Sequence, residues 1–197
     1  MTKTNALACV AFFDKAKAMI IERGYQWEID NCQSFRLMDI TPGTFALQYT
    51  FAVLSSSGLN NRVVQKLYDK FLESAKRGDE NPFLSIANGR HRDAIMVVWA
   101  LHSEILDIIK NKTTDDERIA YIRTLAQMGE KSSRHFARNI GIDCVKPDRW
   151  LLRLADQYGF DTPDELCQCI HKHRPEIRIG TIDVILWRYC NLTGEVE

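Results

Sequence analysis

Apolar residues recur at the three-to-four-residue spacing of an α-helix through almost the whole of this 197-residue chain. No stretch alternates apolar and polar residues for long enough to indicate a β-strand. Glycine and proline interrupt the pattern at short intervals, and helices of ordinary length fit between the interruptions. The pattern therefore predicts an all-α fold.

The breaks in this pattern predict the individual helices. The first helix is expected over residues 5–23, and the stretch from 25 to 39 is ambiguous. Further helices are expected at residues 44–56, at 62–78, as one long buried helix at 91–111, and from 114 to about 126. The last of these begins with a capping box, in which Thr114 is the cap and Glu117 lies three residues later.

Charge and hydropathy exclude several classes of protein. The 26 basic and 26 acidic residues give a net charge of zero, so a site for a polyanion must come from local clustering. The sequence contains no run of about eighteen or more apolar residues, so it predicts no membrane span. Asp14, Lys15 and Lys17 interrupt the apolar N-terminal stretch before a secretory core forms. We therefore expect an intracellular protein, either cytoplasmic and nucleoid-associated or phage-encoded.

The six cysteines form no CxxC pair, and a disulfide framework is not expected inside a cell. Cys167, Cys169, His171 and His173 carry atoms that can bind a metal. However, Cys167 and His171 share one helical face, while Cys169 and His173 share another. Partly buried helix residues without a metal are the favoured interpretation, and no cofactor is expected.

The most informative segment follows residue 120. One helix is expected to end near Gly129 and the next to start near Glu130, so a short break with one glycine separates them. Such a hairpin exposes successive backbone N–H groups ahead of a helix N-terminus, an arrangement that suits a phosphate. Residues 120–155 contain seven Lys or Arg against three Asp or Glu, so this region is basic within a neutral chain. These features favour a DNA-binding hairpin.

The same segment resembles the helix-hairpin-helix DNA glycosylase superfamily, whose pattern runs L-P-G-V-G-x-K-x-A and then, after an interval, V-D-x-H-V-x-R. Here the corresponding residues are Leu125-Ala-Gln-Met-Gly129-Glu-Lys131-Ser-Ser133 and Pro147-Asp148-Arg149-Trp150-Leu-Leu-Arg153. The stretch GEKSSRHFARNIG…DRWLLR is most similar to the archaeal 8-oxoguanine DNA glycosylase/AP lyases. The chain departs from the pattern at three positions, where Ala126 replaces the proline, Gln127 the first glycine and Trp150 the histidine.

The resemblance implies two helical subdomains within one domain, residues 1–197, with a DNA-binding groove between them. Residues about 25–110 would form the middle helical subdomain, and residues about 114–159 would hold the hairpin and the catalytic region. The N-terminal helix and the C-terminal helices would pack together as the other subdomain. The implied activity is excision of a damaged or modified base after nucleotide flipping, with associated AP-lyase (β-elimination) chemistry.

Lys131 and Asp148, which lie 17 residues apart, fall on the family's catalytic positions. The Asp148 carboxylate would stabilise the oxocarbenium character that develops on the sugar. A deprotonated Lys131 amine would attack C1′ and leave a Schiff base. The alternatives are a simple helix cap for Asp148 and a surface contact with phosphate for Lys131.

The resemblance also implies contacts with DNA, with double-stranded DNA as the expected partner of a monomer. The expected DNA-binding residues are Gln127, Met128, Gly129, Ser132, Arg134, Arg149, Asn60 and Asn61. The two asparagines would fill the gap left by the flipped base, although a role in a turn is about equally favoured. The aromatic candidates for a base pocket are Trp150, Phe136, Trp99 and Trp187, although single apolar residues on a helix more often belong to the core.

Three other functions stay open. A glycosylase-fold enzyme of the phage type that modifies thymine bases would keep the flipping pocket but needs no Schiff-base lysine. A non-catalytic helix-hairpin-helix DNA-binding protein needs the hairpin but not Lys131 and Asp148 at catalytic spacing. An all-helical protein-interaction domain accounts for the neutral charge but not for the hairpin.

Overall fold

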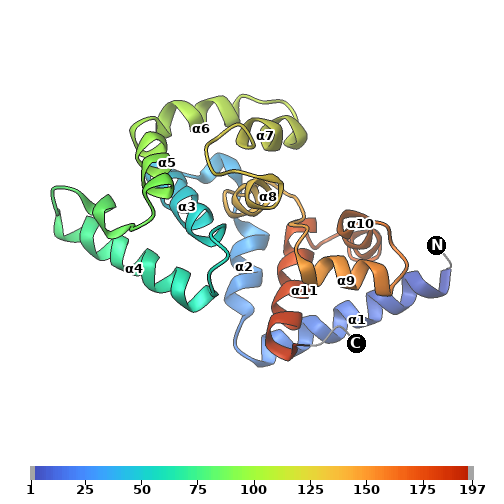
Figure 1. The fold of residues 1–197 in the computed structure, drawn as a ribbon. Helices are drawn as coiled ribbons and strands as arrows, with labels where there is room; N and C mark the ends of the chain where they lie inside the picture. Colours follow the sequence, from blue (N-terminus) through green and yellow to red (C-terminus); the bar gives the residue numbers. More distant parts are fainter. Residues whose placement is uncertain (1–2, 195–197) are drawn as a thin grey trace. The chain divides into compact units, whose positions relative to one another are not determined.

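The computed structural model describes residues 3–194, with the side chains of residues 6–194 except that of Asn61. Within that range the chain forms eleven α-helices and two short 3₁₀ helices, and no strand (Figure 1). The prediction of an all-α fold is therefore confirmed. No helix in the described range is long and apolar enough to cross a membrane. The helices group into two compact units, of which unit 1 is Met1–Arg36 with Gly141–Glu197 and unit 2 is Leu37–Ile140.

Unit 1 is built around its last helix. It contains α1 (Lys3–Glu22), α2 (Gln26–Ser34), α9 (Arg149–Gln157), α10 (Pro163–His173) and α11 (Ile179–Thr193). The last helix, α11, packs against each of the other four. Its apolar sequence explains this position, because a helix that is apolar on most sides is stable only when neighbours cover it. The core of the unit includes the fully buried side chains of Phe13, Ile20, Leu151, Leu154, Ile170 and Ile185.

The helix α2 belongs to unit 1, whereas the sequence placed residues from about 25 onward in a middle subdomain. Two contacts explain the difference. Arg188 of α11 forms a two-bond ion pair with Glu28 of α2, and both side chains are largely buried. Gln33 donates a hydrogen bond of 2.7 Å to the carbonyl of Glu176. These partners are far apart in the sequence, so no local pattern could have assigned α2 to its unit.

Unit 2 is built around α3 (Pro42–Ser55), which packs against four other helices. The remaining elements are η1 (Leu37–Asp39), α4 (Asn61–Arg77), η2 (Pro82–Ser85), α5 (Gly89–Ala100), α6 (His102–Lys110), α7 (Asp115–Ile122) and α8 (Glu130–Asn139). The neighbours of α3 are α4, α5, α6 and α8. Phe45 and Tyr49 of α3 are fully buried, so this helix supplies the centre of the second core.

The prediction of one long helix over residues 91–111 is wrong, because the chain breaks at Leu101 into α5 and α6. The backbone of Leu101 leaves the helical region, with φ −117° and ψ 16°. Neither glycine nor proline marks this position, so the sequence carries no local signal for a break. Both α5 and α6 pack against α3, and a bend allows each of them to reach it.

The capping box at the start of α7 is confirmed. The Thr114 hydroxyl accepts a hydrogen bond from the backbone N–H of Glu117 at 3.2 Å, and the Glu117 carboxylate accepts from the N–H of Thr114 at 3.1 Å. The backbone N–H groups of Thr114 and Thr113 both donate to the Glu117 carboxylate, and these bonds lower its pKa. The helix ends at Ile122, a turn earlier than the expected end near Ala126.

Candidate functional site

The segment Arg123–Gly129 joins α7 to α8, and we call it with these two helices the α7–α8 hairpin. The backbone bonds within it are local, for example Leu125 N–H to the carbonyl of Ile122 at 3.0 Å. Tyr49 of α3 donates its hydroxyl proton to the carbonyl of Ala126. The Met128 side chain is buried, so only its backbone is available to a ligand. The hydrogen bond from Tyr49 and the burial of Met128 therefore fix the hairpin to the rest of unit 2.

Gln127 has a φ of +63° and is the one non-glycine residue with a positive φ in the described range. It occupies the position at which the resembled motif has glycine. The left-handed conformation costs an L-residue about 1–2 kcal/mol because Cβ approaches the following carbonyl oxygen. Gln127 thus adopts the positive φ that glycine favours, although it is not a glycine. The Ser132 hydroxyl supports it by donating to the carbonyls of Gln127 at 3.3 Å and Gly129 at 3.2 Å.

We expect Gln127→Gly to raise the free energy of unfolding by about 0.5–1 kcal/mol, which raises Tm by about 1–4 °C. Glycine removes the strain at positive φ, and the larger entropy of the unfolded glycine chain offsets part of the gain. Thermal and urea unfolding measure the change. Gln127→Ala is the control, because it keeps Cβ and should leave stability nearly unchanged. Destabilisation by the glycine would contradict the strained conformation.

The first turn of α8 follows Gly129, and no side chain caps it. The first three N–H groups of such a helix have no partner within the helix and carry the positive end of its dipole. Lys131 lies in this turn and is exposed, while Arg134 one turn later is half-buried. The other residues of unit 2 therefore do not bury the Lys131 side chain. An anion would be well accommodated here.

Asp148 is the N-cap of α9, as the helix-cap alternative predicts. Its Oδ1 accepts hydrogen bonds from the N–H groups of Trp150 at 2.9 Å and Leu151 at 3.1 Å. Both capping bonds use Oδ1, so Oδ2 takes no part in the cap. Burial raises the pKa of the Cys190 thiol to about 12, with a further contribution from the negative charge of Asp148. The half-buried carboxylate therefore serves as a cap through one of its two oxygens.

The aromatic candidates divide into two groups. Trp150 is half-buried, and the guanidinium carbons of Arg149 and Arg153 lie 5.2 and 5.4 Å from its ring centroid. Trp187 is also half-buried, with the guanidinium of Arg188 at 4.7 Å. Both rings belong to unit 1, and each lies at the edge of its core.

Phe136 instead lies in the core of unit 2, and Trp99 packs at the edge of that core. Phe136 is fully buried, edge-to-face with Phe45 at 5.1 Å and Tyr49 at 5.6 Å. Trp99 packs against Phe71 at 5.6 Å and donates a hydrogen bond to Thr50. The core alternative accounts for Phe136, whose ring is not exposed to stack on an extruded base, whereas Trp99 is half-buried and its place in a base pocket remains a prediction.

Asn60 and Asn61 stand at the start of α4. The Asn60 side chain caps the helix by accepting from the N–H of Arg62 at 2.8 Å. This bond supports the turn-forming alternative, although the residue is exposed and its amide NH₂ remains available. Asn61 is the first residue of α4, and its side chain lies outside the described part of the structure.

The predicted site residues are distributed over both units. Lys131 and the α7–α8 hairpin belong to unit 2, whereas Asp148, Arg149, Trp150 and Trp187 belong to unit 1. Within unit 1, Asp148 and Trp150 are brought together by the cap of α9. Within unit 2, Gln127, Gly129 and Ser132 are brought together by the bonds of the Ser132 hydroxyl.

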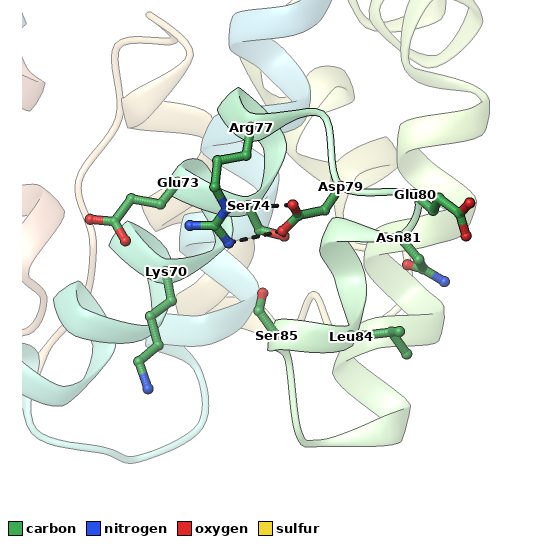
Figure 2. Close-up of a pocket in the computed structure, with 9 residues that line it drawn as sticks. All are labelled: Lys70, Glu73, Ser74, Arg77, Asp79, Glu80, Asn81, Leu84 and Ser85. Carbon is green, nitrogen blue, oxygen red and sulfur yellow. Dashed lines mark hydrogen bonds and ion pairs between the residues drawn. The ribbon is translucent and has the colours of Figure 1, made fainter.

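A hollow of about 770 Å³ lies beside the C-terminal half of α4 (Figure 2). Two of its five charged lining residues, Arg77 and Asp79, pair with each other at 2.9 Å, and Asp79 also accepts a hydrogen bond from Ser74 at 2.6 Å. None of the predicted site residues lines it. The other lining residues are Lys70, Glu73, Glu80, Asn81, Leu84 and Ser85. The hollow therefore adds nothing to the candidate site.

The cysteine–histidine segment of α10 is arranged as ordinary helix. His171 is hydrogen-bonded to the carbonyl of Ile177 at 2.7 Å, and His173 to that of Cys169 at 2.9 Å. Within the described residues, no group of three or more His, Cys, Asp or Glu side chains is placed to hold a metal ion.

Residues that the sequence analysis missed lie at the start of α11. Arg178 and Asp183 bond to the segment that precedes Asp148. One local signal was available, because Asp183 is an acidic residue in the middle of the apolar sequence GTIDVILWRYC. A fully buried carboxylate needs a partner, so such a residue usually has a structural or functional reason.

The chain therefore has an all-α fold of the kind found in a DNA glycosylase. The 8-oxoguanine DNA glycosylase of Thermotoga maritima has a similar structure, with a TM-score of 0.58 over 96% of this chain and 99% of that chain, at 15% sequence identity. Comparison with family models finds no match, and neither does comparison with curated proteins. At this identity the similarity shows the fold.

Proposed function

We propose that this protein is a DNA glycosylase that excises a damaged or modified base after extruding the nucleotide from the duplex. The observation that carries the proposal is the glycosylase-type fold over 96% of the chain, combined with Lys131 and Asp148 at the spacing of the resembled motif. Neither observation would suffice alone, since folds host unrelated activities and short motifs occur by chance.

Asp148 is proposed to stabilise the positive charge that develops on the deoxyribose as the N-glycosidic bond breaks. The capping geometry supports this role, because two backbone donors hold Oδ1 and the cap does not use Oδ2. A carboxylate oriented in advance needs no reorganisation when the charge appears, which is the source of its catalytic effect.

Lys131 is proposed as the nucleophile of an associated lyase step. Its neutral amine forms a bond to C1′ while the base departs with the electron pair of the glycosidic bond and takes up a proton. Opening of the sugar ring then gives a C=N Schiff base. Loss of a C2′ proton expels the 3′ phosphate and nicks the strand. Lys131 is exposed in the protein alone, so the bound DNA would have to supply the surroundings that favour the neutral amine.

The α7–α8 hairpin is proposed to bind a phosphate of double-stranded DNA. The uncapped first turn of α8 supports this role, as does the glycine-type backbone at Gln127. Arg149 is exposed, so it is available to a second phosphate. We propose that the protein acts as an intracellular monomer without a cofactor.

Borohydride trapping on labelled duplexes tests the function. The panel carries 8-oxoguanine first, because that base is named for the structurally similar protein, followed by uracil, 5-hydroxymethyluracil, alkylated purines and an abasic site. Borohydride reduces a Schiff base to a stable amine, so a covalent band identifies both the lyase step and the substrate. Hot-alkali cleavage of parallel reactions detects excision without a Schiff base. No base release from any duplex would contradict the proposal and leave a thymine-modifying enzyme or a non-catalytic DNA-binding protein.

A further inference from the structure

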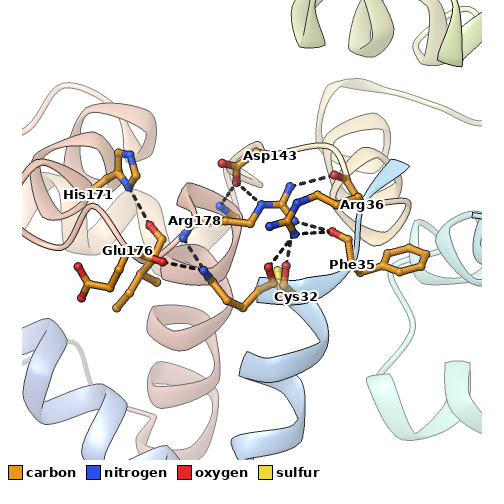
Figure 3. A network of polar contacts seen from close by, with 11 residues as sticks. Cys32, Phe35, Arg36, Asp143, His171, Glu176 and Arg178 are labelled. Carbon is orange, nitrogen blue, oxygen red and sulfur yellow. Dashed lines mark hydrogen bonds and ion pairs between the residues drawn. The ribbon is translucent and has the colours of Figure 1, made fainter. Parts of the chain in front are cut away.

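The start of α11 is hydrogen-bonded to the segment Gly141–Pro147. We call this segment the approach loop because it leads directly to Asp148. Three hydrogen bonds join the two segments, and Figure 3 shows the network around Arg178 and Asp143 to which two of them belong. Arg178 donates to the carbonyl of Gly141 at 2.9 Å, and the N–H of Gly180 donates to Asp143 at 2.8 Å. The carboxylate of Asp183 accepts from the N–H of Lys146 at 2.6 Å. Donor and acceptor are 37 residues apart in each pair, so loop and helix keep one register.

Arg178 also fixes the end of α2. Its guanidinium donates to the carbonyls of Cys32 at 3.0 Å and Phe35 at 2.7 Å, and its side chain is only 15% exposed. The chain leaves unit 1 after Arg36 and re-enters it at Gly141. One side chain therefore joins the segment just before the exit to the residue at the re-entry. A planar guanidinium with its five donors suits such a multiple contact, and lysine does not.

Burial of the Asp183 carboxylate is unfavourable for folding unless hydrogen bonds compensate for the lost water. The Asp183 side chain is fully buried. The bond to Lys146 lies two residues before Asp148, so it determines where the chain arrives at the cap of α9. The helix α9, which Asp148 caps, also packs against α11. The same helix therefore contacts both the approach loop and the surroundings of the carboxylate.

We infer that the first turns of α11 brace the approach loop, and that Asp183 and Arg178 are positioning residues that set the orientation of Asp148. This inference rests on the proposed function for its catalytic consequence. Its structural part, the bracing of the loop, stands on the bonds within unit 1. Neither side chain needs to contact DNA.

Asp183→Leu tests the brace, because it removes the acceptor while keeping the branched shape of the side chain. We expect amide hydrogen exchange in peptides covering residues 141–151 to accelerate about tenfold or more, with exchange in α10 unchanged. The single-turnover rate of base release should fall about 10- to 100-fold, while the Kd for DNA stays within about twofold. Asp183→Asn should restore much of both, since its amide oxygen can still accept from Lys146.

Two matched variants separate positioning from general destabilisation. Thr181→Val alters the same helix at a buried hydroxyl that makes no hydrogen bond in the described structure, and it should behave as wild type. Leu166→Ala removes core packing from α10 and lowers stability, while the three hydrogen bonds between α11 and the approach loop keep their donors and acceptors. Should Asp183→Leu not fold, Arg178→Gln removes the multiple contact at a more accessible position, and we expect the same changes in exchange and rate.

Wild-type exchange of residues 141–151 in a folded brace variant would overturn the inference whatever the activity. Faster exchange with an unchanged rate of base release would overturn the positioning role. A rate loss equal to that of Leu166→Ala at matched stability would do the same. If the wild-type protein releases no base from any duplex, the proposed function fails, and the exchange result alone supports or overturns the brace.

Discussion

Asp148→Asn lowers the single-turnover rate of base release by about 10²–10³-fold while the protein folds normally and still binds DNA. The expected size follows from the loss of one preorganised group that stabilises charge in the transition state. Asparagine caps helices as well as aspartate does, so its Oδ1 can keep the bonds to Trp150 and Leu151. The substitution therefore changes mainly the second oxygen, which becomes an uncharged NH₂ group. Single-turnover assays with excess enzyme, paired with thermal unfolding and DNA titration, measure the three effects.

Two further variants at this position separate catalysis from capping. Asp148→Ser keeps a capping hydroxyl but lacks the second oxygen, so it should lose base release and retain stability. Asp148→Ala removes the cap and should also lower the free energy of unfolding by about 1 kcal/mol. A protein with Asp148→Asn that releases base at the wild-type rate would show that the residue is only a helix cap.

Lys131→Gln is expected to abolish borohydride trapping and strand nicking, since an amide cannot form a Schiff base. Trapping assays on the duplex that gives the strongest wild-type band measure the effect, with a detection range of at least about 10²-fold. Base release by activated water can persist at a reduced rate, so the trapping and base-release assays need not fall together.

Lys131→Arg distinguishes the nucleophile from a phosphate contact. Arginine keeps the positive charge and hydrogen-bond donors but stays protonated, so it retains DNA affinity and cannot attack C1′. A nucleophilic Lys131 predicts loss of trapping in both variants, with DNA affinity weakened more by glutamine. Wild-type trapping with arginine at this position would instead assign the Schiff base to another amine, and the exposed Lys131 would serve only as a phosphate contact.

The sequence alone determined those features that depend on residues within three or four positions of one another. Helical periodicity gave the all-α fold, and the Thr114–Glu117 capping box and the Asp148 cap follow from neighbouring backbone N–H groups. The candidate residues Lys131 and Asp148 also came from the sequence, through their spacing and their resemblance to a family motif. Their chemistry remains a proposal that the variants above test.

Tertiary structure decided what depends on distant partners. The break at Leu101 has no local signal and accompanies the packing of α5 and α6 on α3. Gln127 takes a left-handed backbone within a hairpin supported by Tyr49 and Ser132, against its own preference.

The brace of the approach loop is the clearest case of this dependence. Arg178 and Asp183 meet partners 37 residues away, and Arg178 also reaches the end of α2. Hydrogen bonds and burial of this kind depend on which surfaces the folded chain brings together. A local sequence pattern does not predict such contacts between distant residues.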